Sequence, residues 1–282
     1  MTPNPIVDGA GRLRSGWWAA AFLAVLAGLL VPLLLLAGGR GAEVSLLEQA
    51  ALVLVASLIC QGLRRRPLAE LLGPLDMRWP RQLLLGAVAG ALLMAAPALL
   101  LGLVGAVGWR LNPGGAAAAG AALPLLAAAA VTEELLFRGF LFQRLLHGLG
   151  SWAAQLIIAA LFVLTHSDAL RALGALGLLA GLNIFLASIL FGVAYLRTRS
   201  LAMPLGLHFA ANAVQGPVLG LGISGAGGAG FLVPSLGSAP DWLDGGTFGL
   251  EASLPGLACV VALLALLWRW PARNWPPGGH RI

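Results

Sequence analysis

Long apolar runs alternate with short polar segments along the whole chain. A helix that crosses a membrane needs about 20 mostly apolar residues, because the hydrocarbon layer is about 30 Å thick and a helix rises about 1.5 Å per residue. Eight runs approach this length, of which the fifth is short and the fourth is interrupted by charges. They cover residues 17–37, 44–63, 82–108, 118–146, 151–166, 172–196, 200–221 and 252–269. The pattern predicts an all-α, polytopic integral membrane protein with about eight transmembrane helices.

Two of the segments between these runs have a distinctive composition. Residues 64–81 interleave leucines with Arg and Asp, which predicts either a segment along the cytoplasmic interface or an ordinary charged loop. Residues 222–251 are rich in Gly, Pro and Ser, which is typical of a long loop. We expect this loop on the outer side, with a partly re-entrant course as an option.

The composition excludes a soluble fold. Hydrophobic residues make up 59% of the chain and charged residues 10%, against about 25% charged residues in soluble domains. The net charge of +6 comes entirely from arginine, which clusters between the apolar runs instead of forming one basic face. This placement indicates a lipid bilayer as the partner and argues against nucleic acid.

The arginines also predict an orientation. With a cytoplasmic N-terminus and eight spans, only Arg40, Arg110 and Arg171 face outward, and Arg138 lies inside the membrane. The other thirteen are Arg12, Arg14, Arg64, Arg65, Arg66, Arg78, Arg81, Arg144, Arg197, Arg199, Arg269, Arg273 and Arg281. This excess predicts that both termini are cytoplasmic. The bias toward Ala, Gly and Arg without Lys is typical of a G+C-rich bacterial genome, and hence of a bacterial inner (plasma) membrane.

Ionisable residues interrupt three of the apolar runs. They cost several kcal/mol inside a membrane unless they are paired or face a polar cavity, so each is a candidate functional group. The fourth run contains Glu133, Glu134 and Arg138, the fifth contains His166, and the seventh contains His208 together with Asn212.

Helix geometry separates the two adjacent acids. Residues four apart lie on the same helix face, so Glu134 faces Arg138 and the two charges compensate each other. Glu133 points elsewhere, without a partner on its own helix. A carboxylate that is free in a desolvated pocket is suited to take and return protons.

The remaining polar groups complete a set that suits amide hydrolysis. His208 and Asn212 share a helix face, and His166 comes from another helix. With Glu133 they supply the groups for activating water and for stabilising the oxyanion of a tetrahedral intermediate. We therefore expect these helices to converge on an active site inside the helical bundle. His-Glu-x-x-His is absent, which excludes the usual zincin arrangement.

The order of these groups resembles a known family. Glu133-Glu134 with Arg138, then Phe162 with His166, then His208 with Asn212, resemble the three signature motifs of the CPBP family. This family comprises the type II CAAX prenyl endopeptidases and bacteriocin-processing proteins, also called the Abi family. The similarity covers about residues 120–215, and three motifs in order, each on an expected span, are strong evidence together.

The resemblance implies an intramembrane endopeptidase. Glu133 would be the general base, His166, His208 and Asn212 would position water or stabilise the oxyanion, and Glu134 and Arg138 would orient the site. It divides the chain into N-terminal spans with the interfacial segment (1–115), a catalytic core (116–221), and an outer loop with the last span (222–282). The family is described both as metalloproteases and as metal-free glutamate enzymes. Glu133, His166 and His208 are legitimate zinc ligands, so a single divalent metal and no cofactor both stay open.

Two other classes compete with a peptidase. In a proton-coupled transporter the acids and histidines would relay protons. A non-catalytic membrane immunity or scaffold protein would bind a peptide without cutting it. The expected peptidase substrate is a bacterial peptide, a bacteriocin precursor or a membrane protein. The cleavage site, prenylation of the substrate and the oligomeric state are not readable from the sequence.

Overall fold

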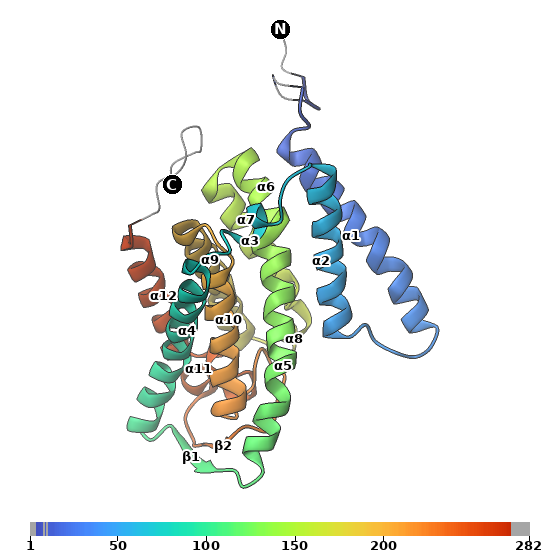
Figure 1. The fold of residues 1–282 in the computed structure, drawn as a ribbon. Coiled ribbons are helices and arrows are strands. Elements are labelled where there is room, and N and C mark those ends of the chain that lie inside the picture. The colour runs from blue at the N-terminus through green and yellow to red at the C-terminus, as the bar shows by residue number, and fades with distance from the viewer. Residues whose placement is uncertain (1–3, 8, 10, 272–282) are drawn as a thin grey trace.

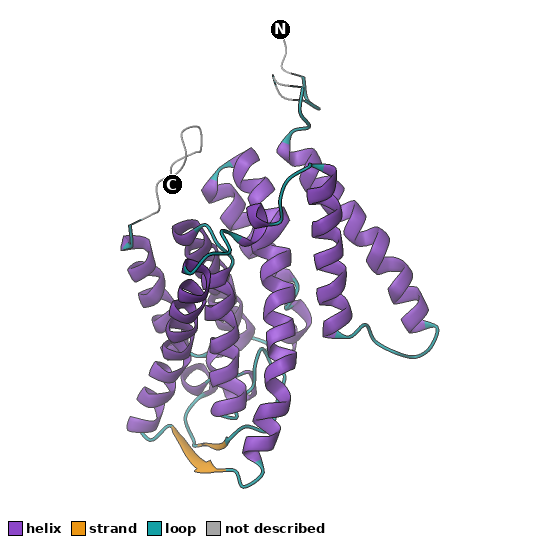
Figure 2. Ribbon diagram, in the orientation of Figure 1, coloured by secondary structure: helices purple, strands orange, loops and turns teal. Residues whose placement is uncertain are grey.

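The computed structural model describes residues 4–7, 9 and 11–271, and nearly all of its regular structure is helical (Figures 1 and 2). The α-helices are α1 (Ser15–Gly38), α2 (Leu46–Leu63), α3 (Ala69–Leu72), α4 (Arg78–Leu103), α5 (Gly115–Glu134), α6 (Phe140–Leu149), α7 (Ser151–Leu164), α8 (Ser167–Ala172), α9 (Leu176–Thr198), α10 (Ala202–Ala213), α11 (Asp241–Asp244) and α12 (Leu254–Arg269). Two π-helices, η1 (Leu135–Gly139) and η2 (Val214–Val218), extend α5 and α10. Short 3-10 turns, η3 (Gly246–Phe248) and η4 (Leu250–Ala252), precede α12, and the strands are β1 (Val107–Leu111) and β2 (Leu232–Leu236).

The all-α, polytopic membrane class is confirmed. In the described part of the chain, five helices are long and apolar enough to cross a membrane, namely α1, α2, α4, α9 and the stretch from α5 to α6. The apolar helices α7 and α12 are shorter, and α10 continues into η2. All eight expected runs therefore contain helix, and five of them meet this length criterion.

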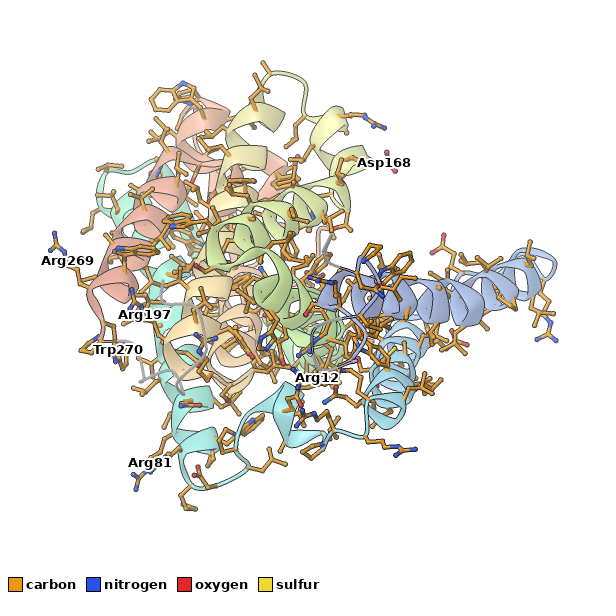
Figure 3. All side chains as sticks on the ribbon, turned by 90° about the horizontal axis from the view of Figure 1, so that it is seen from above. Arg12, Arg81, Asp168, Arg197, Arg269 and Trp270 are labelled. Carbon is orange, nitrogen blue, oxygen red and sulfur yellow. The ribbon has the colours of Figure 1, made fainter. Side chains whose placement is uncertain are left out.

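The long helices run in alternating directions, so the start of α1 and the end of α12 lie at the same end of the molecule (Figure 1). Figure 3 looks onto this end, where Arg12, Arg81, Arg197 and Arg269 are found. Arg40 follows the opposite end of α1. Arg273 and Arg281, which belong to the expected cytoplasmic set, lie outside the described residues. Which end faces the cytoplasm stays a prediction.

Helices α4 and α10 pack with their backbones almost in contact. A Cβ atom added at Gly90 of α4 would collide with the carbonyl oxygen of Leu207, and one at Gly206 of α10 would collide with that of Leu83. Small residues permit this approach, as at many helix crossings in membranes. Leu207 is next to His208, so the crossing fixes the position of that imidazole.

We expect Gly90→Leu to destabilise the protein by roughly 1–3 kcal/mol, because the added side chain must push α10 away from α4. The displacement of His208 should also lower activity. The measurement is thermal unfolding in detergent together with the peptidase activity that the motifs lead us to expect. Gly28→Leu is the matched control, since no atom lies within 4 Å of a Cβ added at that helical glycine. Equal stability of the two variants would show that the crossing is not tight.

The structure corrects the expected third span, which was predicted to reach residue 108. Helix α4 ends at Leu103, because Gly105 turns the chain with a φ of 73°. Val107 then begins β1, which pairs antiparallel with β2 and places Val107 opposite Leu236. The loop that was expected over 222–251 thus contains β2 and α11 and folds back under the helices (Figure 1).

Residues 64–81 pack against the bundle through α3. Leu71 is fully buried, and its carbonyl oxygen accepts a hydrogen bond from Gln143 Nε2 at 3.0 Å. The carbonyl oxygen of Leu72 accepts hydrogen bonds from the Leu201 amide and the Ser200 hydroxyl. The segment is therefore held by α6 and the start of α10.

Candidate active site

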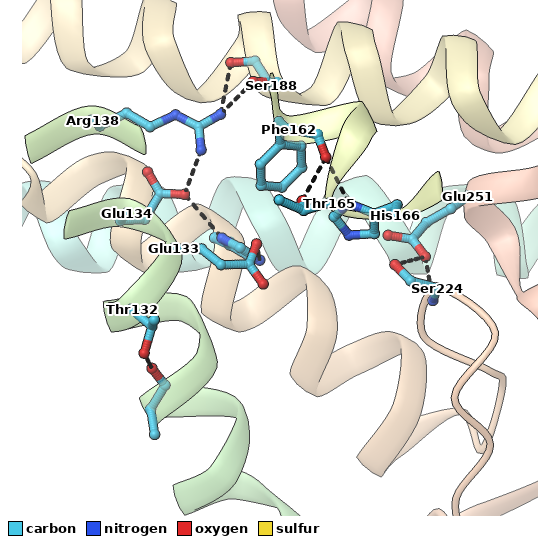
Figure 4. A network of polar contacts seen from close by, with 12 residues as sticks. Thr132, Glu133, Glu134, Arg138, Phe162, Thr165, His166, Ser188, Ser224 and Glu251 are labelled. Atoms are coloured by element: carbon cyan, nitrogen blue, oxygen red, sulfur yellow. Dashed lines mark hydrogen bonds and ion pairs between the residues drawn. The ribbon is translucent and has the colours of Figure 1, made fainter. Parts of the chain in front are cut away.

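The two adjacent acids end α5 at the point where the helix changes its winding. Glu133 and Glu134 are its last residues, and the π-helix η1 carries Arg138 one turn later (Figure 4). A π-bulge widens one turn and is frequent at functional sites. The side chain of Glu133 is 32% exposed, whereas that of Glu134 is 1% exposed. Adjacent acids on one helix thus have opposite environments.

Glu134 and Arg138 form a buried ion pair, as the helix spacing predicted. Arg138 Nη1 lies 3.3 Å from Glu134 Oε1, and Nη2 donates to both the carbonyl oxygen and the hydroxyl of Ser188 (Figure 4). The guanidinium also lies 5.0 Å from the ring of Phe162 and 5.1 Å from that of Phe191. A fully buried arginine is thus matched by one carboxylate, two oxygens of Ser188 and aromatic faces.

His208 connects the two acids. Its Nδ1 lies 2.9 Å from Glu134 Oε1, and its Nε2 lies 3.8 Å from Glu133 Oε2. Its ring also stacks on Phe191, with the centroids 4.9 Å apart. The two ring nitrogens thus point to different acids, Nδ1 to Glu134 and Nε2 to Glu133. The imidazole is therefore fixed in its orientation.

His166 lies in a turn and not on a span. The fifth span was expected to reach residue 166, but α7 ends at Leu164 and His166 is the N-cap of α8. Its Nδ1 donates to the carbonyl oxygen of Phe162 at 2.8 Å and also lies 3.2 Å from the Thr165 hydroxyl (Figure 4). A carbonyl oxygen only accepts, so Nδ1 is the donor in this contact.

The expected site residues divide between a cavity and its wall. Glu133, His166, His208 and Asn212 all line one cavity of about 170 Å³ that is also lined by apolar side chains of α4, α9 and α12. Glu134 and Arg138 are not among its lining residues and lie behind His208 and Glu133. The structure therefore brings together four polar groups from three segments that are distant in the sequence. It keeps the Glu134–Arg138 pair apart from the cavity, as the helix spacing suggested.

Two lining residues were missed by the sequence reasoning. Ser224 and Glu251 come from the segment expected to be an outer loop, yet both line the same cavity. Glu251 Oε2 accepts hydrogen bonds from the Ser224 amide at 2.6 Å and hydroxyl at 2.9 Å (Figure 4). Asn183 of α9 lines the cavity too and donates to the Glu251 carbonyl oxygen at 2.8 Å. The only sequence signal was an acid immediately before the last apolar run.

The donor set matches zinc by type but not by arrangement. Carboxylate oxygens and imidazole nitrogens are usual zinc ligands, and Glu133, His166 and His208 supply them. Within the described ranges, however, no three His, Cys, Asp or Glu side chains are grouped closely enough to hold a metal ion. His208 Nδ1 is also engaged by Glu134.

One known protein family matches the segment that carries most of these polar groups. The family described as type II CAAX prenyl endopeptidase, Rce1-like, matches residues 115–214, which is roughly a third of the chain. The comparison with curated proteins and the comparison with solved structures gave no match to this chain. The matched segment contains both acids, Arg138, both histidines and Asn212, whereas Ser224 and Glu251 lie beyond it. Residues 115–214 are therefore similar to the type II CAAX prenyl endopeptidases, which supports the resemblance to the CPBP family that the three motifs indicated.

Proposed function

We propose that this protein hydrolyses a peptide bond of a membrane-associated peptide or protein by means of a water molecule that Glu133 activates. The observation that carries the proposal is the difference between the surroundings of the two adjacent acids at the end of α5. Glu134 is held by Arg138 and His208, whereas Glu133 faces the cavity with its Oε2 3.8 Å from His208 Nε2.

Water activation uses the acceptors that face the cavity. The 3.8 Å between Glu133 Oε2 and His208 Nε2 is too long for a hydrogen bond, but it suits a water molecule in contact with both groups. One O–H of this water points to Glu133 and the other to an imidazole Nε2. Glu133 takes the first proton as the water oxygen attacks the scissile carbonyl carbon.

The tetrahedral intermediate then needs a donor. The attack moves the carbonyl π electrons onto oxygen, and the Asn212 side-chain amide, one turn after His208, is placed to donate to this oxyanion. Collapse breaks the C–N bond, and Glu133 returns its proton to the leaving nitrogen. The oxyanion re-forms the carbonyl bond as the C–N bond breaks, so the products are a carboxylic acid and an amine. The glutamate carboxylate is regenerated.

The setting follows from the arginine distribution. We place the protein in a bacterial inner membrane with both termini in the cytoplasm, because the described arginines concentrate at the end where α1 starts and α12 ends. The substrate is then a bacterial peptide, a bacteriocin precursor or a membrane protein. Residues 116–221 form the catalytic core in this proposal, and 1–115 and 222–282 flank it.

Analysis of peptide termini tests this function. Membranes that contain the wild-type protein should release peptide termini that are absent with His208→Gln, and the purified protein should generate the same termini. Substrate flux into proteoliposomes without new termini would instead establish a transporter, and retention of an intact peptide would establish a binding protein. Activity that survives exhaustive chelation would favour water activated by glutamate alone, whereas loss that stoichiometric zinc restores would overturn the metal-free step.

Asn212→Ala should lower kcat by about 10²- to 10³-fold with little change in KM, because the amide stabilises charge that develops only in the transition state. The measurement is steady-state cleavage of an identified substrate. Asn183→Ala is the matched control, since this amide donates to a backbone carbonyl of the cavity wall. A variant that raised KM alone would show that Asn212 binds substrate instead.

A further inference from the structure

A second, larger pocket lies at the end of the molecule where α1 begins. It has a volume of about 710 Å³ and shares no lining residue with the catalytic cavity. Its wall comes from α1, the end of α2, the segment before α4, and α6. The polar side chains that matter here are Arg64, Arg66, Glu70 and Arg144.

These four side chains carry an excess of positive charge. Glu70 Oε1 lies 2.9 Å from Arg64 Nη1 and 3.1 Å from Arg144 Nη2, and Glu70 Oε2 lies 3.9 Å from Arg66 Nε. Three guanidinium groups thus share one carboxylate, which leaves two positive charges that these residues do not compensate. Such a cluster favours an anion with several acceptor oxygens.

The cluster is built into the fold. The side chain of Arg144 is 6% exposed and that of Arg64 is 11% exposed. The two guanidinium groups lie 5.6 and 5.7 Å from the ring of Phe140, and Arg64 lies 6.0 Å from the ring of Trp18. These contacts hold the arginines in place before any ligand arrives, which lowers the entropy lost on binding.

The surroundings of the pocket are apolar. Leu63 lines it and is 65% exposed, and Trp17, in the first turn of α1 beside the lining residue Trp18, is 50% exposed. Helix α1 is an apolar candidate span of which little is buried within the protein. A charged pocket beside exposed apolar groups, at the end of a membrane-spanning helix, matches the boundary where a lipid head group meets its acyl chains.

We propose that this pocket binds the phosphate of an anionic phospholipid head group, with Arg64, Arg66 and Arg144 as its donors. The phosphate oxygens accept hydrogen bonds from the guanidinium groups, and the acyl chains lie along α1. The site depends neither on the proposed chemistry of Glu133 nor on the peptidase substrate.

The test uses the purified full chain in nanodiscs of phosphatidylcholine alone or mixed equally with phosphatidylglycerol. Phosphatidylglycerol should raise the Tm of the wild-type protein by several degrees, and native mass spectrometry should detect retained phosphatidylglycerol. In Arg64→Gln/Arg66→Gln both effects should fall by more than half. The matched control is Arg78→Gln/Arg81→Gln, which removes the same charge from the same end of the bundle and should respond like the wild type.

The following outcomes would contradict a phospholipid site in this pocket. Equal responses of the two double variants would show a general preference for anionic membranes. The same rise in Tm with inorganic phosphate in phosphatidylcholine discs would assign the pocket to a soluble phosphate. If the first double variant does not fold, Arg66→Gln alone takes its place, because this half-exposed side chain contacts Glu70 only at 3.9 Å and has no other ion pair within the described residues. An unchanged lipid response in that variant would overturn the role of Arg66 as a donor.

Discussion

Replacing Glu133 with Gln is expected to lower the rate of peptide cleavage by about 10²- to 10⁴-fold while leaving the protein folded. Glutamine has nearly the same shape but does not accept a proton from water. The side chain is part-exposed in the cavity, and Arg138 forms its ion pair with Glu134, so neutralising Glu133 leaves that buried pair intact. The measurement is turnover of an identified peptide by purified protein, together with its Tm.

The matched control for this variant is Glu43→Gln, which removes an exposed acid between α1 and α2 and should keep full activity. Cleavage at the wild-type rate by Glu133→Gln would remove the glutamate-base mechanism. In that case His208, whose Nδ1–H is held by Glu134, would be the remaining base, and His208→Gln would be the inactive variant.

Most of the helical architecture was predictable because membrane helices are specified by local composition. Apolar runs of sufficient length have few alternatives in a bilayer, so all eight contain helix in the structure. The errors fall where a run ends. The third run stays apolar through Val107, but Gly105 adopts a left-handed conformation and the following residues pair with β2. This pairing joins residues more than a hundred positions apart, which local composition does not encode.

The candidate site was predictable to the extent that it violates the apolar pattern. Glu133, Glu134 and Arg138 stand out in a membrane span, and the four-residue spacing alone identified which acid pairs with the arginine. His208 Nδ1 binding to Glu134 was not foreseeable, because it depends on the close crossing of α4 and α10 and on the π-helix after α5.

Ser224 and Glu251 show the opposite case. They lie in and beside a Gly-rich segment, where polar residues are ordinary and no periodicity indicates a direction. Their place in the cavity follows from the return of this segment beneath the bundle, where the Ser224 amide and hydroxyl bind Glu251. A polar residue in an apolar run thus indicates a functional site, whereas a polar residue in a loop does not, although residues of both kinds line this cavity.

Arg138→Met should destabilise the protein by about 3–5 kcal/mol, because it leaves the Glu134 carboxylate buried without its cation. The loss should appear in the free energy of unfolding, measured by denaturant titration in detergent. Removing both charges is a different matter, since replacing a whole buried pair with apolar side chains of similar volume is often nearly neutral. Glu134→Leu/Arg138→Met should therefore recover most of the lost stability.

Activity should not recover with stability in that double variant. His208 Nδ1 would lose the carboxylate that orients the ring, so Nε2 would no longer be held facing Glu133. A stable but inactive double variant would assign Glu134 and Arg138 to the positioning of His208. Recovery of cleavage together with stability would instead show that the pair serves only to stabilise the fold, and that stacking on Phe191 alone orients the imidazole.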